Sequence, residues 1–356
     1  MLIGIDGNEA NEVQKVGIGQ FAHQLLTTIE KIDTQNSYLV YLKNPPNSDM
    51  PLSSTRWQYR VFGPKKMWTR FALPLKLLFQ SEKLDCFFSP SHYTPLFCRF
   101  PLICSIMDLG FLHYPQQFTR KDLYQLTAWT KNSVVHSKHI VTISQFTKDE
   151  IISQYHKAEN DITIAYPGAK IPSKINSEKP IQPFFLSLGT LKPSKNIPFL
   201  IRAFGQFSKD HPDYQLIIAG KKGWLFDDIY VVVKELRLED KIVFQDYISE
   251  DQKWVLLQQA SALIIPSLYE GFGFPAVEAM AVGTPVIASN VASLPEIVKG
   301  YGIIINPTNL NELTKAMVTI IEPKNYQKYH LLGIKRAAQF TWDKTAKSVI
   351  NCFNKL

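Results

Sequence analysis

Two carboxylates eight residues apart flank a short glycine-containing loop, and this is the most informative pattern in the chain. Glu270 and Glu278 enclose Gly271 and Gly273, with Pro275 between the second glycine and the second carboxylate. The apolar run ASALIIPSLY upstream predicts a strand, and PAVEAMA downstream predicts a helix that begins at a proline. Glycines let a backbone approach a ligand, and helix N-terminal amides favour an anion. Amides for phosphate and carboxylates for hydroxyls indicate a sugar-nucleotide site; an ordinary glycine turn with solvated glutamates is the alternative interpretation.

A second loop has the residues of a phosphate site. In LSLGTLKPSKNIPFLIRAF a predicted strand ends at Gly189, and Lys192 and Lys195 precede a helix that begins near Asn196. Two ammonium groups beside a helix N-terminus can bind a diphosphate. Solvated lysines on a surface loop are the alternative, but the Glu270–Glu278 loop in the same half of the chain favours the diphosphate site.

Length and composition predict a protein of two globular domains. The chain has 356 residues, and a single hydrophobic core rarely grows past roughly 250 residues. It is 45% hydrophobic and 20% charged, as is ordinary for a soluble protein. No apolar run reaches the ~20 residues of a membrane span, and MLIGIDGNEA predicts a first strand instead of a signal peptide. The four cysteines lack metal-ligand spacing, so we expect reduced thiols and a cytoplasmic location.

The charge balance favours anionic partners. The net charge is +8 and the sequence pI is about 9.1, which suits nucleotide phosphates, a lipid diphosphate or an acidic membrane surface. No nucleic-acid-binding motif is present, so we expect no nucleic acid partner. The stretch KKMWTRFALPLKLLFQSEK at 65–83 combines lysines with large apolar side chains, as interfacial helices do. Pro74 is expected to interrupt it, and a core-facing helix with solvated lysines is the alternative to peripheral membrane contact.

The order of the elements predicts an α/β protein with two doubly wound, Rossmann-like domains facing a central cleft. Short apolar runs alternate with amphipathic stretches along the chain. Expected strands lie at 2–6, 38–42, 59–62, 86–90, 102–107 and 139–144, and a second series lies at 183–189, 214–220, 241–246, 261–267, 284–289 and 302–306. In such sheets ligands bind beyond the carboxyl ends of the strands.

Composition places the domain boundaries. The segment 171–183 has three prolines and no periodicity, so we expect a first domain at 1–172 and a linker at 173–183. A second domain at 184–340 follows, and 341–356 predicts a terminal amphipathic helix that packs back on the first domain. Within the first domain, Ser144 is expected to cap a helix, and Thr147 to Glu150 has capping-box spacing.

At this level of detail the chain resembles the retaining glycosyltransferases of family four, which have the GT-B fold and include bacterial mannosyltransferases and polysaccharide-assembly enzymes. The resemblance covers nearly the whole chain. The segments similar to family landmarks are GIGQFAHQLL at 17–26, SIMDLGFLHYPQQF at 105–118, VTISQFTKDEI at 141–151, AYPGAK at 165–170, LGTLKPSKN at 188–196, PSLYEGFGFPAVEAMAVGTPVIAS at 266–289 and LPE at 294–296. In this context the Glu-x7-Glu element is highly specific.

The resemblance implies roles for individual residues in binding a nucleoside diphosphate sugar. Glu278 is expected to bind the ribose hydroxyls and Glu270 the hydroxyls of the donor sugar. Lys195, supported by Lys192, is expected to bind the diphosphate, and the nucleobase to rest near 244–247. The remaining expected donor-site residues are Gly17 and Gly19 in an N-terminal loop that closes over the phosphates, and the loop residues Gly271, Phe272, Gly273 and Phe274.

This chain departs from the family pattern at two positions. Many relatives have His-Asp-Leu where this chain has Met107-Asp108-Leu109, and a methionine cannot donate a hydrogen bond or carry charge. Asp108, His92 or His113 are the alternatives for supplying polarity there, although a lone histidine is more often structural. Close relatives also have Pro-Arg-Lys-Asn where Ser194 replaces the arginine, which removes a bidentate phosphate contact.

The expected activity is transfer of a hexose, of mannose or glucose type, to a saccharide or lipid-linked saccharide acceptor in polysaccharide biosynthesis. Lysines and helix-end amides would stabilise the diphosphate leaving group. The chain has no obvious Asp-x-Asp motif, so we expect no metal, and the resemblance implies retention by front-face attack. We expect Lys195, Glu270 and Asp108 to act in catalysis, with Glu270 as a positioning group. A catalytically degenerate sugar-nucleotide-binding protein and a sugar-nucleotide epimerase or hydrolase are the competing hypotheses.

Overall fold

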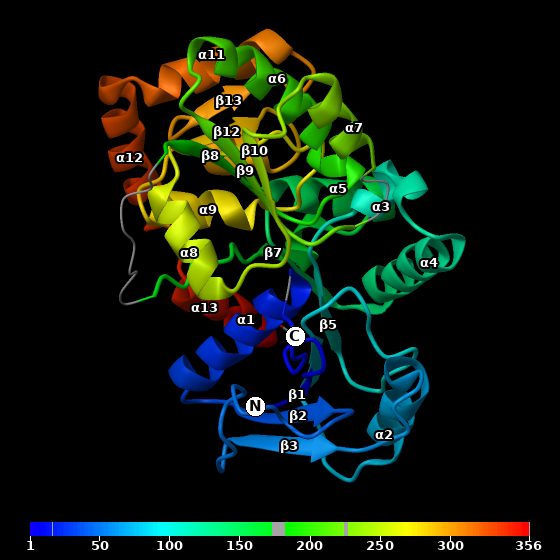
Figure 1. The fold of residues 1–356 in the computed structure, drawn as a ribbon. Helices are drawn as coiled ribbons and strands as arrows, with labels where there is room; N and C mark the ends of the chain where they lie inside the picture. The colour runs from blue at the N-terminus through cyan, green and yellow to red at the C-terminus, as the bar shows by residue number, and fades with distance from the viewer. Residues whose placement is uncertain (16, 173–181, 224–226, 356) are drawn as a thin grey trace. The chain divides into compact units, whose positions relative to one another are not determined.

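The computed structural model describes residues 1–15, 17–172, 182–223 and 227–355. Most of the linker predicted at 173–183 therefore lies outside the described residues. The chain divides into two compact units, of which the first comprises Met1–Gly168 and the segment from Thr341 onward, and the second comprises Ala169–Phe340. Each unit is a parallel sheet with helices, and this confirms the predicted α/β class (Figure 1).

The sheet of the first unit has seven parallel strands in the order β3-β2-β1-β4-β5-β6-β7. Its first six strands follow the doubly wound order, and β7 adds an edge strand that the sequence analysis did not predict. Central strands such as β5 and β6 are buried along their whole length, which explains their continuous apolar runs. The strands are β1 Leu2–Asp6, β2 Ser37–Leu42, β3 Trp57–Val61, β4 Cys86–Ser89, β5 Leu102–Ile106, β6 His139–Thr142 and β7 Ile162–Ile164.

Three helices of the first unit, α4, α5 and α13, begin at side-chain caps. Thr119 caps α4 and Ser144 caps α5, each accepting a hydrogen bond from the backbone N–H three residues later. The capping box predicted from Thr147 to Glu150 is wrong, because Ser144 is the cap and the Glu150 carboxylate pairs with His113 instead. The helices are α1 Ile18–Ile32, the π-helical turn η1 Trp68–Ala72, α2 Leu73–Phe79, α3 Gly110–His113, α4 Arg120–His136, α5 Gln145–Tyr155 and α13 Trp342–Phe353, with 3-10 turns at Pro115–Gln117 and Glu159–Asp161.

The predicted interruption at Pro74 is also wrong. The π-helical turn η1 passes directly into α2, and Pro74 lies in the first turn of α2. The change from π-helical to α-helical hydrogen bonding lies next to this proline, whose ring nitrogen cannot donate a hydrogen bond.

The helix α13 lies against the first unit although it follows the second unit in the chain. It packs on α1, where the ring centroids of Phe21 and Trp342 are 5.9 Å apart. At its other end the ring of Phe353 packs against Phe88 and Tyr38, at 5.7 and 6.4 Å. The last helix therefore completes the hydrophobic core of the first unit.

The sheet of the second unit has six parallel strands in the order β10-β9-β8-β11-β12-β13, the doubly wound order again. Its strands are β8 Phe184–Leu188, β9 Gln215–Ala219, β10 Ile242–Gln245, β11 Ala262–Ile265, β12 Val286–Ser289 and β13 Ile303–Ile305. Its helices are α6 Ile197–Asp210, α7 Asp227–Glu235, α8 Glu250–Gln259, α9 Phe274–Ala281, α10 Leu294–Val298, α11 Leu310–Ile321 and α12 Pro323–Ala337, with a 3-10 turn at Pro193–Lys195.

Among the described residues, no helix is both long and apolar enough to cross a bilayer. The four cysteines are free thiols. Burial raises the pKa of Cys104 to about 12, so this side chain stays a neutral part of the core.

Candidate functional site

The Glu270 carboxylate lies in the loop between β11 and α9 and is held in place by three neighbours. Ser267 Oγ donates a hydrogen bond of 2.7 Å to Glu270 Oε1, and Lys195 Nζ forms a short ion pair with the same atom. Ser293 Oγ donates to the main-chain oxygen of Glu270 at 2.8 Å. Both the side chain and the backbone of Glu270 are therefore fixed before any ligand arrives.

The turn after β8 brings Lys195 to this carboxylate. Lys195 ends a 3-10 turn, and Asn196 then adopts a left-handed backbone (φ 55°) before α6 begins. The N–H of Leu268 donates a hydrogen bond of 2.8 Å to the carbonyl of Ser194. This bond joins the β8–α6 loop to the β11–α9 loop, so the two loops that the sequence analysis singled out separately meet at the ends of adjacent strands.

A small pocket lies where the two loops meet. Its lining includes Ser187, Gly189, Lys195 and Ser267. A Cβ atom at Gly189 (φ 139°) would lie only 3.2 Å from Lys195 Cε, so the glycine leaves room for the lysine stem. The pocket therefore has an ammonium group and hydroxyls on its wall, as an anionic or hydroxylated ligand requires.

Neighbouring charges keep Glu270 ionised. Burial alone would raise the pKa of its carboxyl. The Lys195 ammonium, the hydrogen bonds from Lys195 and Ser267, and the charge of Lys192 outweigh burial and hold the pKa below its ordinary value. At neutral pH Glu270 is a carboxylate that can only accept hydrogen bonds.

The second carboxylate, Glu278, is buried on α9 and pairs with a lysine that the sequence analysis missed. Lys253 Nζ lies 2.7 Å from Glu278 Oε1 and 2.8 Å from Glu250 Oε2. Burial is the largest effect on Glu278 and raises its pKa, although Lys253 acts in the opposite direction. Lys253 lies on α8, and no local motif marks it, because its partner is 25 residues away in the chain.

The loop between the two glutamates turns sharply into α9. Gly273 is the residue before the helix and has φ 95°, and a Cβ there would lie 2.9 Å from Leu294 Cδ2. The Phe272 ring is buried, with ring centroids 5.5 Å from Phe274 and 5.7 Å from Phe340. Phe272 can therefore contribute only its main chain to a ligand, as the resemblance implies for this loop.

The nucleobase was expected near 244–247, which follows β10. Tyr247 is exposed there, and Lys221 Nζ lies 4.8 Å from the centre of its ring. The carbonyl of Gln245 accepts a hydrogen bond of 2.9 Å from the N–H of Gly220. This segment thus offers a ring and a cation next to the end of β10.

The glycines Gly17 and Gly19 belong to the first unit, at the start of α1. Gly17 precedes the helix with φ 52°, and a Cβ on Gly19 would lie 3.1 Å from the carbonyl oxygen of Glu9. The loop 6–15 therefore passes close to the first turn of α1.

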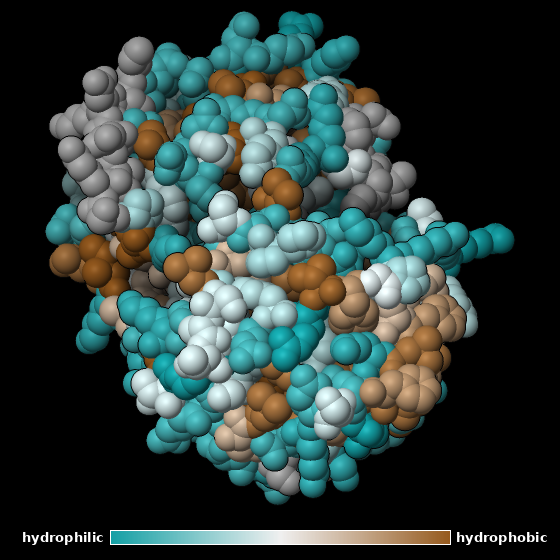
Figure 2. Space-filling model, turned by 90° about the horizontal axis from the view of Figure 1, so that it is seen from below, coloured by the Kyte–Doolittle hydropathy of each residue, from teal (hydrophilic) through white to brown (hydrophobic). Residues whose placement is uncertain are grey.

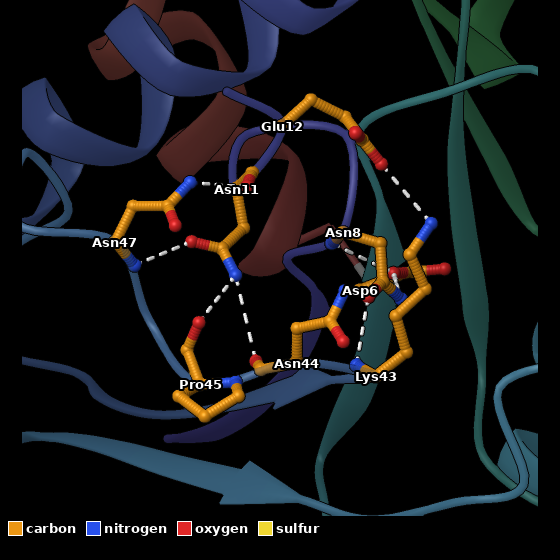
Figure 3. A network of polar contacts seen from close by, with 8 residues as sticks. All are labelled: Asp6, Asn8, Asn11, Glu12, Lys43, Asn44, Pro45 and Asn47. Carbon is orange, nitrogen blue, oxygen red and sulfur yellow. Dashed lines mark hydrogen bonds and ion pairs between the residues drawn. The ribbon is translucent and has the colours of Figure 1, made fainter.

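A network of polar side chains holds that loop against the segment after β2 (Figure 3). Asn11 Nδ2 donates to the carbonyl of Pro45 at 2.9 Å, and the N–H of Asn47 donates to Asn11 Oδ1 at 2.7 Å. Lys43 Nζ pairs with Glu12 Oε1 at 3.0 Å. No sequence motif marks this network, although its residues follow β1 and β2 at the sheet edge where ligands bind in such folds.

At the base of the network, Asp6 is a buried carboxyl that contacts a neutral partner. Asn8 donates to Asp6 Oδ1 from its backbone N–H at 3.1 Å and from Nδ2 at 2.7 Å. Asn8 Oδ1 in turn accepts from the N–H of Lys43 at 2.8 Å. Burial raises the pKa of Asp6 to about 6, because these hydrogen bonds only partly offset the loss of hydration.

The histidine proposed as a substitute at position 107 has a structural contact. His92 is buried, and its Nε2 accepts a hydrogen bond of 3.0 Å from the backbone N–H of Met107. Burial lowers the pKa of His92, so the ring is neutral near pH 7. Thr147 Oγ1 donates to the carbonyl of Met107 at 3.2 Å. His92 and Thr147 thus fix the backbone of Met107, whose side chain is buried.

Asp108 and His113, the other two candidates for supplying polarity beside Met107, lie in the segment that follows β5. Asp108 is half-buried, and its Oδ1 accepts a hydrogen bond of 2.9 Å from the N–H of Gly110 at the start of α3. His113, at the end of α3, pairs closely with Glu150. Among the described residues, no three His, Cys, Asp or Glu side chains gather as metal ligands do.

Comparison with protein families and curated proteins gives a consistent result. The family model of glycosyl transferases group 1 matches residues 170–334, which include both glutamates and Lys195. An O-antigen chain mannosyltransferase, RfbU of Salmonella typhimurium, is 30% identical over 249 residues that cover 70% of this chain and 68% of that protein. O-antigen chain mannosyltransferase B of Escherichia coli is 27% identical over 267 residues, covering 71% of this chain and 70% of that protein.

The fold has close counterparts among solved structures. Anabaena HepE, solved in complex with UDP-glucose, matches with a TM-score of 0.74 over 100% of this chain and 99% of that chain, at 18% identity. At this identity the likeness concerns the fold, which is the GT-B fold expected from the resemblance.

Proposed function

Because this chain belongs to the group 1 glycosyl transferases, we propose that it transfers a hexose from a nucleoside diphosphate sugar to a saccharide or lipid-linked saccharide acceptor, with retention at the anomeric carbon. Membership of this family makes the chain a glycosyltransferase. Two O-antigen mannosyltransferases among its relatives support mannose as the hexose and polysaccharide assembly as the process.

The contact between Lys195 and Glu270 carries the proposed donor site. The Glu270 carboxylate is the anion that holds the Lys195 ammonium at the pocket. A diphosphate bound there would be a second anion for Lys195 and for the nearby Lys192, while the ionised Glu270 would accept hydrogen bonds from the sugar. Glu278, which lies on α9 eight residues after Glu270, would accept hydrogen bonds from the ribose hydroxyls.

The reaction that fits these groups has no covalent enzyme intermediate. The bond between the anomeric carbon and the phosphate oxygen breaks, and the electron pair leaves with the diphosphate. The acceptor oxygen bonds to the anomeric carbon on the same face, and its proton passes to the departing phosphate. Lys195 and Lys192 would stabilise the developing negative charge electrostatically.

Glu270 fits a positioning role better than that of a nucleophile. Its carboxylate already shares one oxygen with Lys195 and Ser267, and its pKa is below the ordinary value. A carboxylate stabilised in this way is a weak base and a weak nucleophile. We propose that it orients the sugar and that no metal takes part.

A ligand-stability panel tests the donor site directly. Melting temperature would be measured with GDP, UDP and ADP and their hexose conjugates, each with magnesium and with EDTA. A ligand present at about 100 times its dissociation constant adds about 2.7 kcal/mol, which gives a clear shift. We expect one nucleotide to stabilise the protein equally in both conditions; stabilisation only with magnesium would contradict the metal-free mechanism.

Variants then separate the donor site from the fold. Glu278→Ala and Lys195→Met should lose the ligand shift, whereas Glu239→Ala, at an exposed glutamate of the second unit, should keep it. Retained affinity in Glu278→Ala would overturn the ribose assignment. With the donor identified, NMR of the product distinguishes transfer with retention from epimerisation or hydrolysis, and binding without turnover would identify a degenerate enzyme.

A further inference from the structure

The helix formed by η1 and α2 is apolar on two sides, but only one side faces the core. Trp68, Leu73 and Leu77 are buried and pack into a hydrophobic cluster of the first unit. Its other side presents large apolar side chains that are between 41% and 79% exposed, namely Phe71, Leu75, Leu78 and Phe79. A helix that is apolar all round is normally covered on every side.

A second segment extends this surface. Leu96 and Phe97, between β4 and β5, are also exposed. The segment that carries them contacts α2: Cys98 packs against the hydrophobic cluster that contains Leu73 and Leu77, and Arg99 Nη2 donates a hydrogen bond of 2.7 Å to the carbonyl of Gln80, the residue that follows the helix. We define the α2 face as Met67, Phe71, Leu75, Leu78, Phe79, Leu96 and Phe97, all of them exposed.

Figure 2 shows hydrophobic residues gathered at the right of the view from below, on the side where α2 lies in Figure 1. An apolar patch of this kind on a folded protein marks a contact with a partner or a membrane.

The charges around the α2 face are almost all positive. Lys65, Lys66, Lys76 and Lys83 are exposed around it. The acidic residue in the same stretch, Glu82, has its carboxylate 3.3 Å from Arg60 Nη2, so its charge is offset. A partner for this face must therefore be apolar in the centre and anionic at its rim.

We propose that the α2 face docks on a lipid bilayer with anionic headgroups. The aromatic and aliphatic side chains would enter the interface between headgroups and acyl chains, and the lysines would contact the headgroups. A second copy of this chain fits less well. In a two-fold dimer the same patch meets itself, which would place these lysines opposite one another.

Sedimentation with lipid vesicles tests the docking surface in the full chain. Vesicles of phosphatidylcholine alone would be compared with vesicles that also contain phosphatidylglycerol, at low and at high salt. We expect binding to the anionic vesicles at low salt, and weaker binding to neutral vesicles and at high salt. Absence of binding to anionic vesicles at low salt would overturn the proposal.

Matched variants assign the binding to this face. Phe71→Ser with Phe79→Ser should weaken vesicle binding roughly tenfold, because two aromatic side chains no longer enter the interface. The control is Val231→Ser with Leu331→Ser, which removes two exposed apolar side chains from α7 and α12 of the second unit. Equal loss in the control would contradict the assignment, and unchanged melting temperatures would show that both variants fold.

A second pair of variants tests the charge. Lys76→Glu with Lys83→Glu should abolish the preference for anionic vesicles, whereas Lys121→Glu with Lys131→Glu, on α4, changes the net charge equally and should keep it.

Light scattering of the wild type tests whether a second copy of the chain covers the α2 face instead. A dimer that Phe71→Ser with Phe79→Ser dissociates would show that a second copy covers the face. Vesicle binding requires no donor or acceptor, so its outcome is independent of the transfer reaction.

Discussion

The side chains of Glu270 and Glu278 are 15% and 10% exposed, and each contacts a lysine, but their pKa values move in opposite directions. The pKa of Glu270 is below the ordinary value and that of Glu278 is above it. The difference lies in the neighbours. Glu270 has Lys195, the Ser267 hydroxyl and the charge of Lys192 around it. Glu278 shares Lys253 with a second carboxylate, Glu250, whose negative charge opposes ionisation.

This contrast indicates that burial of a carboxylate does not determine its charge state. At Glu270 the surrounding cations keep a permanent acceptor beside the pocket. At Glu278 burial leaves the ionised form less favourable, so that a ligand hydroxyl donating to the carboxylate would replace part of the lost hydration. Both carboxylates can accept hydrogen bonds from hydroxyls, but their opposite pKa shifts predict opposite effects of pH on the free energy of unfolding.

The largest expected effect on stability is that of Glu270→Gln. The variant leaves the Lys195 ammonium beside a neutral amide, and breaking a buried ion pair costs about 3 kcal/mol of unfolding free energy at pH 7. Because the pKa of Glu270 is lowered in the fold, its contribution is present above the ordinary value of 4.5 and is lost as the pH falls through the folded value. Urea unfolding from pH 3 to 8 measures this; a deficit that stays constant in acid would contradict the ion pair.

The next largest effect is expected for Asp6 of the first unit, where the substitution should increase the free energy of unfolding instead of lowering it. The two glutamates contact charged lysines, whereas Asp6 contacts the neutral side chain of Asn8. Burial raises the pKa of Asp6 from 3.8 to about 6. Stability is therefore highest below the ordinary pKa and is lost as the pH rises through 6. Asp6→Asn keeps an acceptor for Asn8 and should exceed the wild type by about 3 kcal/mol at pH 8, with little gain at pH 4. Thermal unfolding at the two pH values decides, and an equal gain at both would show that ionisation is not the cause.

Gly273 connects the two glutamates, and its replacement should have an intermediate effect. Gly273→Ala places a Cβ at positive φ and 2.9 Å from Leu294, which should cost about 1–2 kcal/mol and displace the loop. Gly300→Ala is the control, because Gly300 has a similar φ of 87° but no atom within 4 Å of the added Cβ. We expect Gly273→Ala alone to weaken nucleotide binding in the thermal-shift panel. Equal losses of stability in the two variants would show that backbone strain, and not the clash, is responsible.

The smallest effect on stability should be that of Glu278→Gln. Lys253 keeps its contact with Glu250, and the amide removes an ionisation that burial makes unfavourable, so stability should change by less than about 1 kcal/mol at pH 7. Since the pKa of Glu278 is raised, the variant should gain relative to the wild type as the pH increases, opposite to Glu270→Gln. Unfolding of both variants in one pH series measures the two slopes. Parallel slopes would refute the contrast between the two carboxylates.

The sequence was sufficient for most of the fold because the buried parallel strands are continuous apolar runs bounded by turns. The edge strand β7 was not predicted from the sequence, because it has only three residues and follows the polar turn Glu159–Asp161. The approach of Lys195 to Glu270 was predictable, since both follow strands whose carboxyl ends share one sheet edge. The partner of Glu278 was not, because the packing of α8 beside α9 determines which side chain of α8 reaches it.

Other parts of the site depend on contacts that no short pattern encodes. The capping-box spacing at Thr147–Glu150 occurs within α5, where Glu150 instead meets His113 from a segment 37 residues earlier. The polar network around Asp6 and Asn11 joins two loops without helical or strand periodicity. The role of His92, which binds the backbone of Met107, is likewise visible only in three dimensions.

The placement of α13 has a consequence for how this chain is made. The second unit is one uninterrupted stretch of sequence, so it can acquire its native structure as soon as it has emerged from the ribosome. The first unit is translated earlier, but its core cannot be completed at that stage. Trp342 and Phe353 become available to this core only after the whole second unit has been synthesised. The order of folding during translation is therefore expected to be the reverse of the order of the sequence. Until then the surfaces of Phe21 and Phe88 that face α13 stay uncovered, and this is the interval in which a nascent chain would depend on a chaperone.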